Sequence, residues 1–315
     1  MDPYLKQRRW IGMRSVNQID LSVEFAGLKL QNPIMAASGC FGYGEEFAKI
    51  EGFDPCRLGA IVSKGTTLLP RDGNLQPRIC EHQGGMVNSI GLENPGIDVV
   101  LEEKVPFMAW FGVPVILNIS GFTIEEFAIM AKKANSAKGV SALEVNISCP
   151  NVHGGRIPFG CDPLIAGQVT AAVREVTDLP IIVKLTPNVD EGIIGVIAQA
   201  VEAAGADAIS MINTVKVENV GGIKIGGLSG RPIKQTALNL IKIVRRFVSV
   251  PIIGMGGIYN VPDVIEFLKA GCKGVAVGTA NFSNPLVMME LKDGLGKYCL
   301  ENGIQNLSQL RGTEK

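Results

Sequence analysis

Three features of this 315-residue sequence predict an α/β fold, a closed (β/α)8 TIM barrel. Eight short apolar runs each end in a small or polar residue, and longer amphipathic stretches separate most of them. The runs are almost continuously apolar, which is typical of parallel strands covered by helices on both faces. Eight such units over this length favour a closed barrel over an open doubly wound sheet.

Each expected strand is a run rich in Val, Ile, Leu and Ala, bounded by Pro, Gly or polar residues. The eight runs are Pro33–Ser38, Ala60–Gly65, Pro114–Ser120, Leu143–Cys149, Pro180–Thr186, Ala208–Asn213, Pro251–Gly256 and Gly274–Thr279. The expected helices are amphipathic, and several are entered through Asp or Thr caps. They lie at Thr123–Asn135, Leu164–Val176, Ile193–Ala204, Lys234–Phe247 and Val261–Lys269.

Two long segments depart from the repeat. Arg71–Gly91 has no helical period and reads as hairpin-like pieces around Gly84-Gly85, and Lys216–Arg231 contains two glycine pairs. Long connections of this kind in a compact domain are often functional, so we expect insertions over the C-terminal rim of the barrel. No linker or shift in composition indicates a second domain. We therefore expect one domain over residues 1–315, with an N-terminal extension at 1–17.

Composition narrows the classes of function. Lys and Arg balance Asp and Glu at 30 each, without a long basic run, so a nucleic-acid partner is not expected. No apolar run approaches the roughly 18–20 residues that span a bilayer, and the N-terminus lacks the apolar centre of a secretory signal. We expect a cytoplasmic protein without membrane contact. The seven cysteines form no CxxC pair, so neither a disulfide framework nor a metal site is expected in this chain.

Polar or glycine residues lie at the carboxyl ends of the expected strands, the end at which barrel active sites are found. These residues are Ser38, Lys64, Asn118, Asn146, Cys149, Lys184, Asn213, Gly256-Gly257 and Gly278-Thr279. The two lysines follow apolar runs, so each ammonium needs an anion or a route to solvent. Two lysines on one rim favour an anionic ligand, such as a carboxylate, a phosphate or the pyrimidine edge of a reduced flavin.

Cys149 ends a strand and opens a glycine-rich loop in ALEVNISCPNVHGGRIPFGC, residues 142–161. A thiol on a loop that opens and closes suits a catalytic group, although a small buried hydrophobe is equally expected from residue type alone. GMGGI at 254–258 and VGTA at 277–280 end the last two strands. Glycines in these two loops commonly let backbone N–H groups approach a phosphate, so a phosphorylated cofactor or substrate is indicated.

Several segments together resemble the dihydroorotate dehydrogenase family over about residues 21–291. They are GGMVNSIGLENPG at 84–96, NISCPN at 146–151, KLTPN at 184–188, INT at 212–214 and GLSG at 227–230, with the two glycine segments above. The resemblance implies an FMN-containing barrel that oxidises dihydroorotate to orotate in pyrimidine biosynthesis. Cys149 matches the general base of class 1 enzymes, which takes a proton from carbon 5 while a hydride leaves carbon 6.

The resemblance also implies the remaining site residues. Substrate-binding positions correspond to Lys64, Asn88, Ile90, Gly91, Leu92, Asn146, Asn213 and Thr214. Positions that contact FMN correspond to Ser38, Lys64, Gly65, Asn118, Asn146, Lys184, Ile212, Gly230, Gly256, Gly257, Gly278 and Thr279, with the last four at the phosphate. Amide side chains suit the N–H and C=O groups of a pyrimidine ring, and Lys64 suits its carboxylate.

The loop at 151–163 resembles class 1B, whose catalytic subunit pairs with a subunit carrying FAD and a 2Fe–2S cluster that passes electrons to NAD. This implies a homodimeric core within a heterotetramer. Cys161 departs from a Thr-like residue expected there. The alternatives are a class 1A homodimer that reduces fumarate, a non-flavin phosphate-binding isomerase or lyase using Lys64 or Lys184, and a non-catalytic barrel that docks a partner.

Overall fold

The computed structural model describes residues 19–82, 84–148 and 159–310. Eight parallel strands close into a barrel in the order β10-β13-β14-β3-β4-β7-β8-β9. They are β3 (Ile34–Ala36), β4 (Ala60–Val62), β7 (Val115–Ile119), β8 (Ala142–Asn146), β9 (Ile181–Lys184), β10 (Ala208–Met211), β13 (Ile252–Met255) and β14 (Gly274–Val277). Each lies within or at the edge of an expected run, so the predicted (β/α)8 barrel is confirmed.

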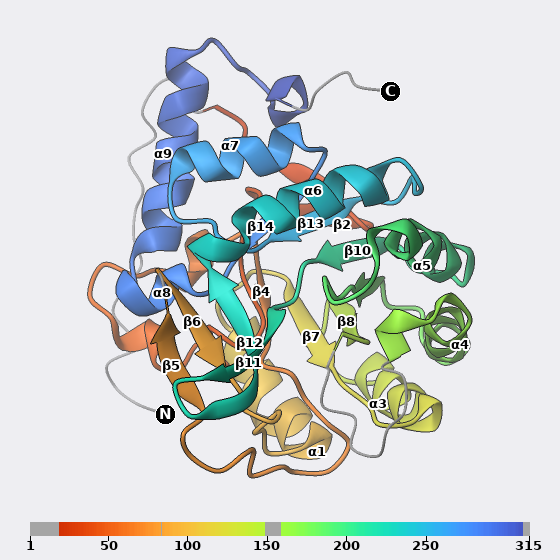
Figure 1. The fold of residues 1–315 in the computed structure, drawn as a ribbon. Helices are drawn as coiled ribbons and strands as arrows, with labels where there is room; N and C mark the ends of the chain where they lie inside the picture. The colour runs from red at the N-terminus through yellow and green to blue at the C-terminus, as the bar shows by residue number, and fades with distance from the viewer. Residues whose placement is uncertain (1–18, 83, 149–158, 311–315) are drawn as a thin grey trace.

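Helices surround the barrel (Figure 1). The five predicted helices are confirmed as α3 (Ile124–Asn135), α4 (Pro163–Arg174), α5 (Glu191–Ala203), α6 (Lys234–Arg245) and α7 (Val261–Lys269). Polar side chains fix several of their starts: Thr123 accepts a hydrogen bond from the Glu126 amide, and Asn260 with Asp263 forms a capping box. The other helical segments are α1 (Ile97–Val99), a π-helical turn (Val100–Lys104), α2 (Val105–Ala109), α8 (Ala280–Ser283) and α9 (Val287–Glu301).

Short 3₁₀ turns complete the helical structure. They occupy Phe47–Lys49, Pro55–Arg57, Phe159–Cys161, Arg231–Ile233 and Leu307–Leu310. The first two stand between β3 and β4, where the barrel repeat would place a helix. No helix among the described residues combines the length and apolar character needed to cross a membrane.

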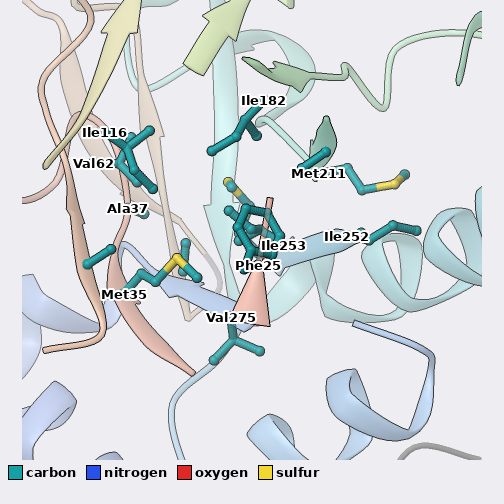
Figure 2. Close-up of a cluster of buried hydrophobic side chains, with 14 of the residues drawn as sticks. Phe25, Met35, Ala37, Val62, Ile116, Ile182, Met211, Ile252, Ile253 and Val275 are labelled. Carbon is teal, nitrogen blue, oxygen red and sulfur yellow. The ribbon is translucent and has the colours of Figure 1, made fainter. Parts of the chain in front are cut away.

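An N-terminal hairpin, β1 (Val23–Phe25) with β2 (Leu28–Leu30), precedes the barrel and was not predicted from the sequence. Phe25 is fully buried in it and belongs to the barrel's hydrophobic core. Figure 2 shows its ring in one cluster with Met35, Ile253 and Val275. The hairpin therefore contributes to the core with a strand only three residues long.

The two insertions form a second sheet. Arg71–Gly91 contains β5 (Ile79–His82) and β6 (Gly85–Asn88), which confirms the predicted hairpin around Gly84-Gly85. The second insertion forms β11 (Val215–Val220) and β12 (Ile223–Gly230). β12 pairs with β6, so all four strands form one antiparallel sheet in the order β11-β12-β6-β5 (Figure 1).

Candidate active site

Two adjoining cavities lie at the C-terminal end of the barrel. The larger has a volume of about 440 Å³, and both the barrel rim and the strands β5, β6 and β12 contribute to its wall. That volume lies in the range of small-molecule sites. The smaller cavity lies beside the loops that follow β13 and β14. The cavities share Ser38, Cys40, Lys184, Asn213, Thr214 and Ser229, so one extended ligand would reach both.

Most of the predicted site residues line these cavities. The larger one is lined by Ser38, Lys64, Gly65, Asn88, Ile90, Gly91, Leu92, Asn146, Lys184, Asn213 and Thr214. The smaller one adds Ile212, Gly230, Gly256, Gly257, Gly278 and Thr279. Asn118 lies below the rim, fully buried, and its Oδ1 is 3.2 Å from the point where a Cβ on Gly65 would stand. Cys149 lies outside the described residues.

The smaller cavity has the character of a phosphate cup. Among the described residues, the backbone N–H groups of Gly256, Gly257, Gly278 and Thr279 donate to no backbone carbonyl. Gly256 and Gly257 have φ angles of +116° and +79°, which an L side chain rarely adopts. Successive free amides in such a turn form a concave site for an anion. The Thr279 hydroxyl donates to the Ser229 hydroxyl at 2.9 Å and closes one side.

A buried carboxylate that the sequence reasoning missed lies beneath the larger cavity. Glu144 on β8 is fully buried and accepts hydrogen bonds from Asn118 Nδ2 at 2.5 Å and from Ser210 Oγ at 2.7 Å. Its Oε2 also lies 3.5 Å from the Lys184 ammonium. A glutamate flanked by Leu143 and Val145 within a buried strand was the available signal, because a buried charge needs a partner.

The two rim lysines therefore differ in their surroundings. Lys184 is 4% exposed and already has a carboxylate partner in the protein. Lys64 also lines the larger cavity, but no ion pair joins it to a carboxylate within the described residues. The sequence interpretation treated both lysines as available to an anionic ligand. The geometry leaves Lys64 as the better candidate to bind a carboxylate.

Three side chains fix the backbone just before Cys149. The Ser148 hydroxyl donates to Asn146 Oδ1 at 2.5 Å and accepts from Asn213 Nδ2 at 2.6 Å. The Asn213 Oδ1 in turn accepts from the Thr214 amide at 2.8 Å. The ends of β8 and β10 are thus joined through one hydroxyl. This bridge holds the carboxyl end of β8, the position from which the chain enters the segment containing Cys149.

A family model for dihydroorotate dehydrogenase matches residues 20–299, nearly the whole described chain. The chain belongs to the dihydroorotate dehydrogenase family. It is 49% identical over 300 residues to the protein named dihydroorotate dehydrogenase B (NAD(+)), catalytic subunit, of Geobacillus sp. (strain WCH70), covering 93% of this chain and 95% of that protein. The family predicted from the sequence motifs is therefore confirmed.

Two other relatives with the same name cover the chain equally well. The protein from Desulforamulus reducens is 48% identical over 303 residues, covering 94% of this chain and 98% of the relative. The protein from Thermoanaerobacter pseudethanolicus is 46% identical over 309 residues, covering 94% of this chain and 99% of the relative. Membership of the dihydroorotate dehydrogenase family thus extends over the barrel and both insertions.

Cys40 is a cavity-lining thiol to which the sequence reasoning assigned no role in the site. It lines both cavities beside Ser38. Burial raises the pKa of the Cys40 thiol to about 11, although the nearby Lys184 charge favours the thiolate. Cys40 is therefore neutral at physiological pH and is poorly suited to act as a base there.

Proposed function

We propose that this chain is the catalytic subunit of an FMN-dependent enzyme that oxidises (S)-dihydroorotate to orotate in pyrimidine biosynthesis. The observation that carries the proposal is the pair of adjoining cavities. One offers free backbone amides to a phosphate, and the other places amide side chains and Lys64 around a space large enough for stacked rings. Family membership and the names of the relatives support the same reaction.

The residues present fit FMN. Its phosphate would be held by the amides of Gly256, Gly257, Gly278 and Thr279, which donate to no backbone carbonyl among the described residues. A further fit is offered by Asn118 Oδ1, a buried acceptor without a partner in the described structure. Lys184 lines both cavities and would lie beside the flavin. When bound, FMN supplies a hydride acceptor, a capacity that amino-acid side chains lack.

The roles proposed for the protein's own residues follow from their chemistry. Lys64 would bind the carboxylate of dihydroorotate, because no protein carboxylate pairs with it within the described residues. Asn88, Asn146 and Asn213 would orient the pyrimidine ring, since amides both donate and accept hydrogen bonds. Cys149 would remove the proton from carbon 5 as the general base while carbon 6 loses a hydride. Ile90, Gly91 and Leu92 would close the remaining wall.

We further propose that electrons pass to NAD through a partner subunit carrying FAD and a 2Fe–2S cluster, in a heterotetramer built on a homodimer. The relatives are named catalytic subunits of an NAD(+)-dependent enzyme, which supports a partner of this kind. A cytoplasmic location belongs to the same proposal. The isomerase or lyase alternative is not the one that family membership supports, and Lys184, one of its two candidate lysines, is already paired with Glu144.

The test is oxidation of dihydroorotate by the purified, FMN-reconstituted chain with three acceptors: an artificial dye, NAD and fumarate. We expect turnover with the dye, none with fumarate, and none with NAD until the partner subunit is added. Turnover with fumarate by this chain alone would identify the class 1A reaction instead. A colourless protein that neither binds FMN nor oxidises dihydroorotate would refute the proposed function.

A further inference from the structure

Glu144 is the centre of a polar cluster on four neighbouring strands. Asn118 on β7, Glu144 on β8, Lys184 on β9 and Ser210 on β10 meet inside the barrel, and Asn118 and Glu144 are register partners. Oε1 accepts from Ser210, while Oε2 accepts from Asn118 and faces the Lys184 ammonium. A buried carboxylate with partners on both oxygens is held in one orientation. The cluster is therefore a fixed platform directly below the larger cavity.

The carboxylate determines which atom Asn118 presents. An ionised carboxylate only accepts hydrogen bonds, so the amide of Asn118 must direct its NH2 group toward Glu144. The remaining atom, Oδ1, is buried and has no hydrogen-bond partner in the described structure. It lies beside Gly65, which lines the larger cavity. Asn118 Oδ1 therefore lies directly behind Gly65, one residue back from the cavity wall, in an orientation fixed by Glu144.

The carboxylate also changes the charge that the cavity experiences. Lys184 lines both cavities, but its ammonium is 3.5 Å from Glu144 Oε2. At this distance in a buried environment the two opposite charges largely offset each other. An anionic form of a ligand beside Lys184 is then stabilised less than it would be by an isolated ammonium.

We propose that Glu144 is a positioning residue for the flavin, which holds Asn118 behind Gly65 of the cavity wall and offsets the Lys184 charge, and thereby lowers the flavin reduction potential. This inference rests on the proposed function, because it requires FMN in the larger cavity. A reduced flavin carries negative charge on its pyrimidine portion, whereas the oxidised ring is neutral. The reduced form is therefore the one that responds to the balance between Lys184 and Glu144.

The test compares Glu144→Gln, Lys184→Met and the double variant, each reconstituted with FMN. The reduction potential is measured against a reference dye, and FMN affinity by flavin fluorescence. Glu144→Gln should favour binding of reduced over oxidised FMN by about tenfold, which corresponds to a rise of about 30 mV for a two-electron couple. Lys184→Met should lower the potential. The double variant should return toward the parent, because its pair of charges is again balanced.

The matched control is Glu202→Gln. Glu202 on α5 also accepts several hydrogen bonds, from Ser249 and Val250, but lines neither cavity. Its replacement should leave the potential unchanged. An unchanged or lowered reduction potential in Glu144→Gln would overturn the inference. Shifts of the same sign in Glu144→Gln and Lys184→Met would overturn it as well. If Glu144→Gln does not fold, the comparison of Lys184→Met with the double variant still tests the inference. The inference requires the double variant to have a higher reduction potential than Lys184→Met.

The proposed function and this inference fail in different ways. A parent chain that binds no FMN and does not oxidise dihydroorotate with a dye would refute the proposed function. A parent that does both, together with a Glu144→Gln variant whose potential matches the parent, would refute only the role given to Glu144.

Discussion

Gly257→Ala is expected to damage both the stability of the barrel and the phosphate cup. An added Cβ would lie 2.6 Å from Lys234 Cβ and 3.0 Å from the Gly230 carbonyl oxygen. Lys234 begins α6 and Gly230 ends β12, so relief of the contact would have to move a helix or the edge of the second sheet. The φ angle of +79° is also unfavourable for alanine.

The expected loss in the free energy of unfolding is the sum of two contributions, the strained backbone and the overpacking. A non-glycine residue in the left-handed region costs about 1–2 kcal/mol, and overpacking adds about 1–3 kcal/mol. The free energy of unfolding should therefore fall by about 2–5 kcal/mol. In the proposed binding mode, displacement of the Gly257 amide would remove one charge-assisted hydrogen bond to the FMN phosphate, worth about 1.5–3 kcal/mol, so FMN affinity should fall at least tenfold.

Gly112→Ala separates the two contributions. Gly112 has a φ of +71°, but nothing lies within 4 Å of the added Cβ, and it precedes β7 at the opposite end of the barrel. Urea unfolding of the flavin-free variants should show a loss of about 1–2 kcal/mol for Gly112→Ala, with unchanged FMN affinity in a fluorescence titration. Equal stability losses in the two variants, or normal FMN affinity in Gly257→Ala, would refute the reasoning.

Three further predictions concern the thiols and Lys64. Cys149→Ala should retain FMN but lose most dye-linked turnover, and Cys149→Ser should keep a little activity that rises toward high pH; full activity of the alanine variant would exclude Cys149 as the base. Lys64→Gln should raise the KM for dihydroorotate roughly 10–100-fold through loss of a charge-assisted hydrogen bond, whereas Lys216→Gln in the β11 ion pair should not. The pKa of the Cys40 thiol is raised to about 11 in the folded protein, from an ordinary value of 9.0. As the pH rises from 9 through 11 the thiol therefore ionises first in the unfolded chain, and the folded protein should lose up to about 2–3 kcal/mol of stability. Cys40→Ala should flatten this part of the stability profile measured by urea unfolding, and an identical profile would contradict the assignment.

The barrel was predictable because its signals are local and repeated. Pro251–Gly256, for example, is apolar throughout, and Val261–Lys269 has a capping residue, a proline in its first turn and an amphipathic period, so strand and helix were both placed correctly. The β1–β2 hairpin gives no comparable signal, since three-residue strands are too short to show a period. Phe25 acquires its role only through contacts made by distant segments.

The candidate site shows the same division. Most of the glycine segments and rim polar residues singled out in the sequence line the cavities, because the ends of parallel strands gather at one rim. The pairing of Lys184 with Glu144 was missed, because adjacency across strands depends on register, which the sequence does not display. The role of Cys149 remains a prediction, since it lies outside the described residues.

The pairing of β6 with β12 has a consequence for the order of folding. These strands are joined between residues 85–88 and 227–230, so their contact closes a loop of well over a hundred residues. Such distant contacts form slowly and depend on the intervening chain being in place. The second sheet should therefore assemble after the neighbouring strands of the barrel have docked. The ability to retain FMN should therefore return last during refolding, after the helical circular-dichroism signal has recovered. FMN binding would then report the assembly of the second sheet.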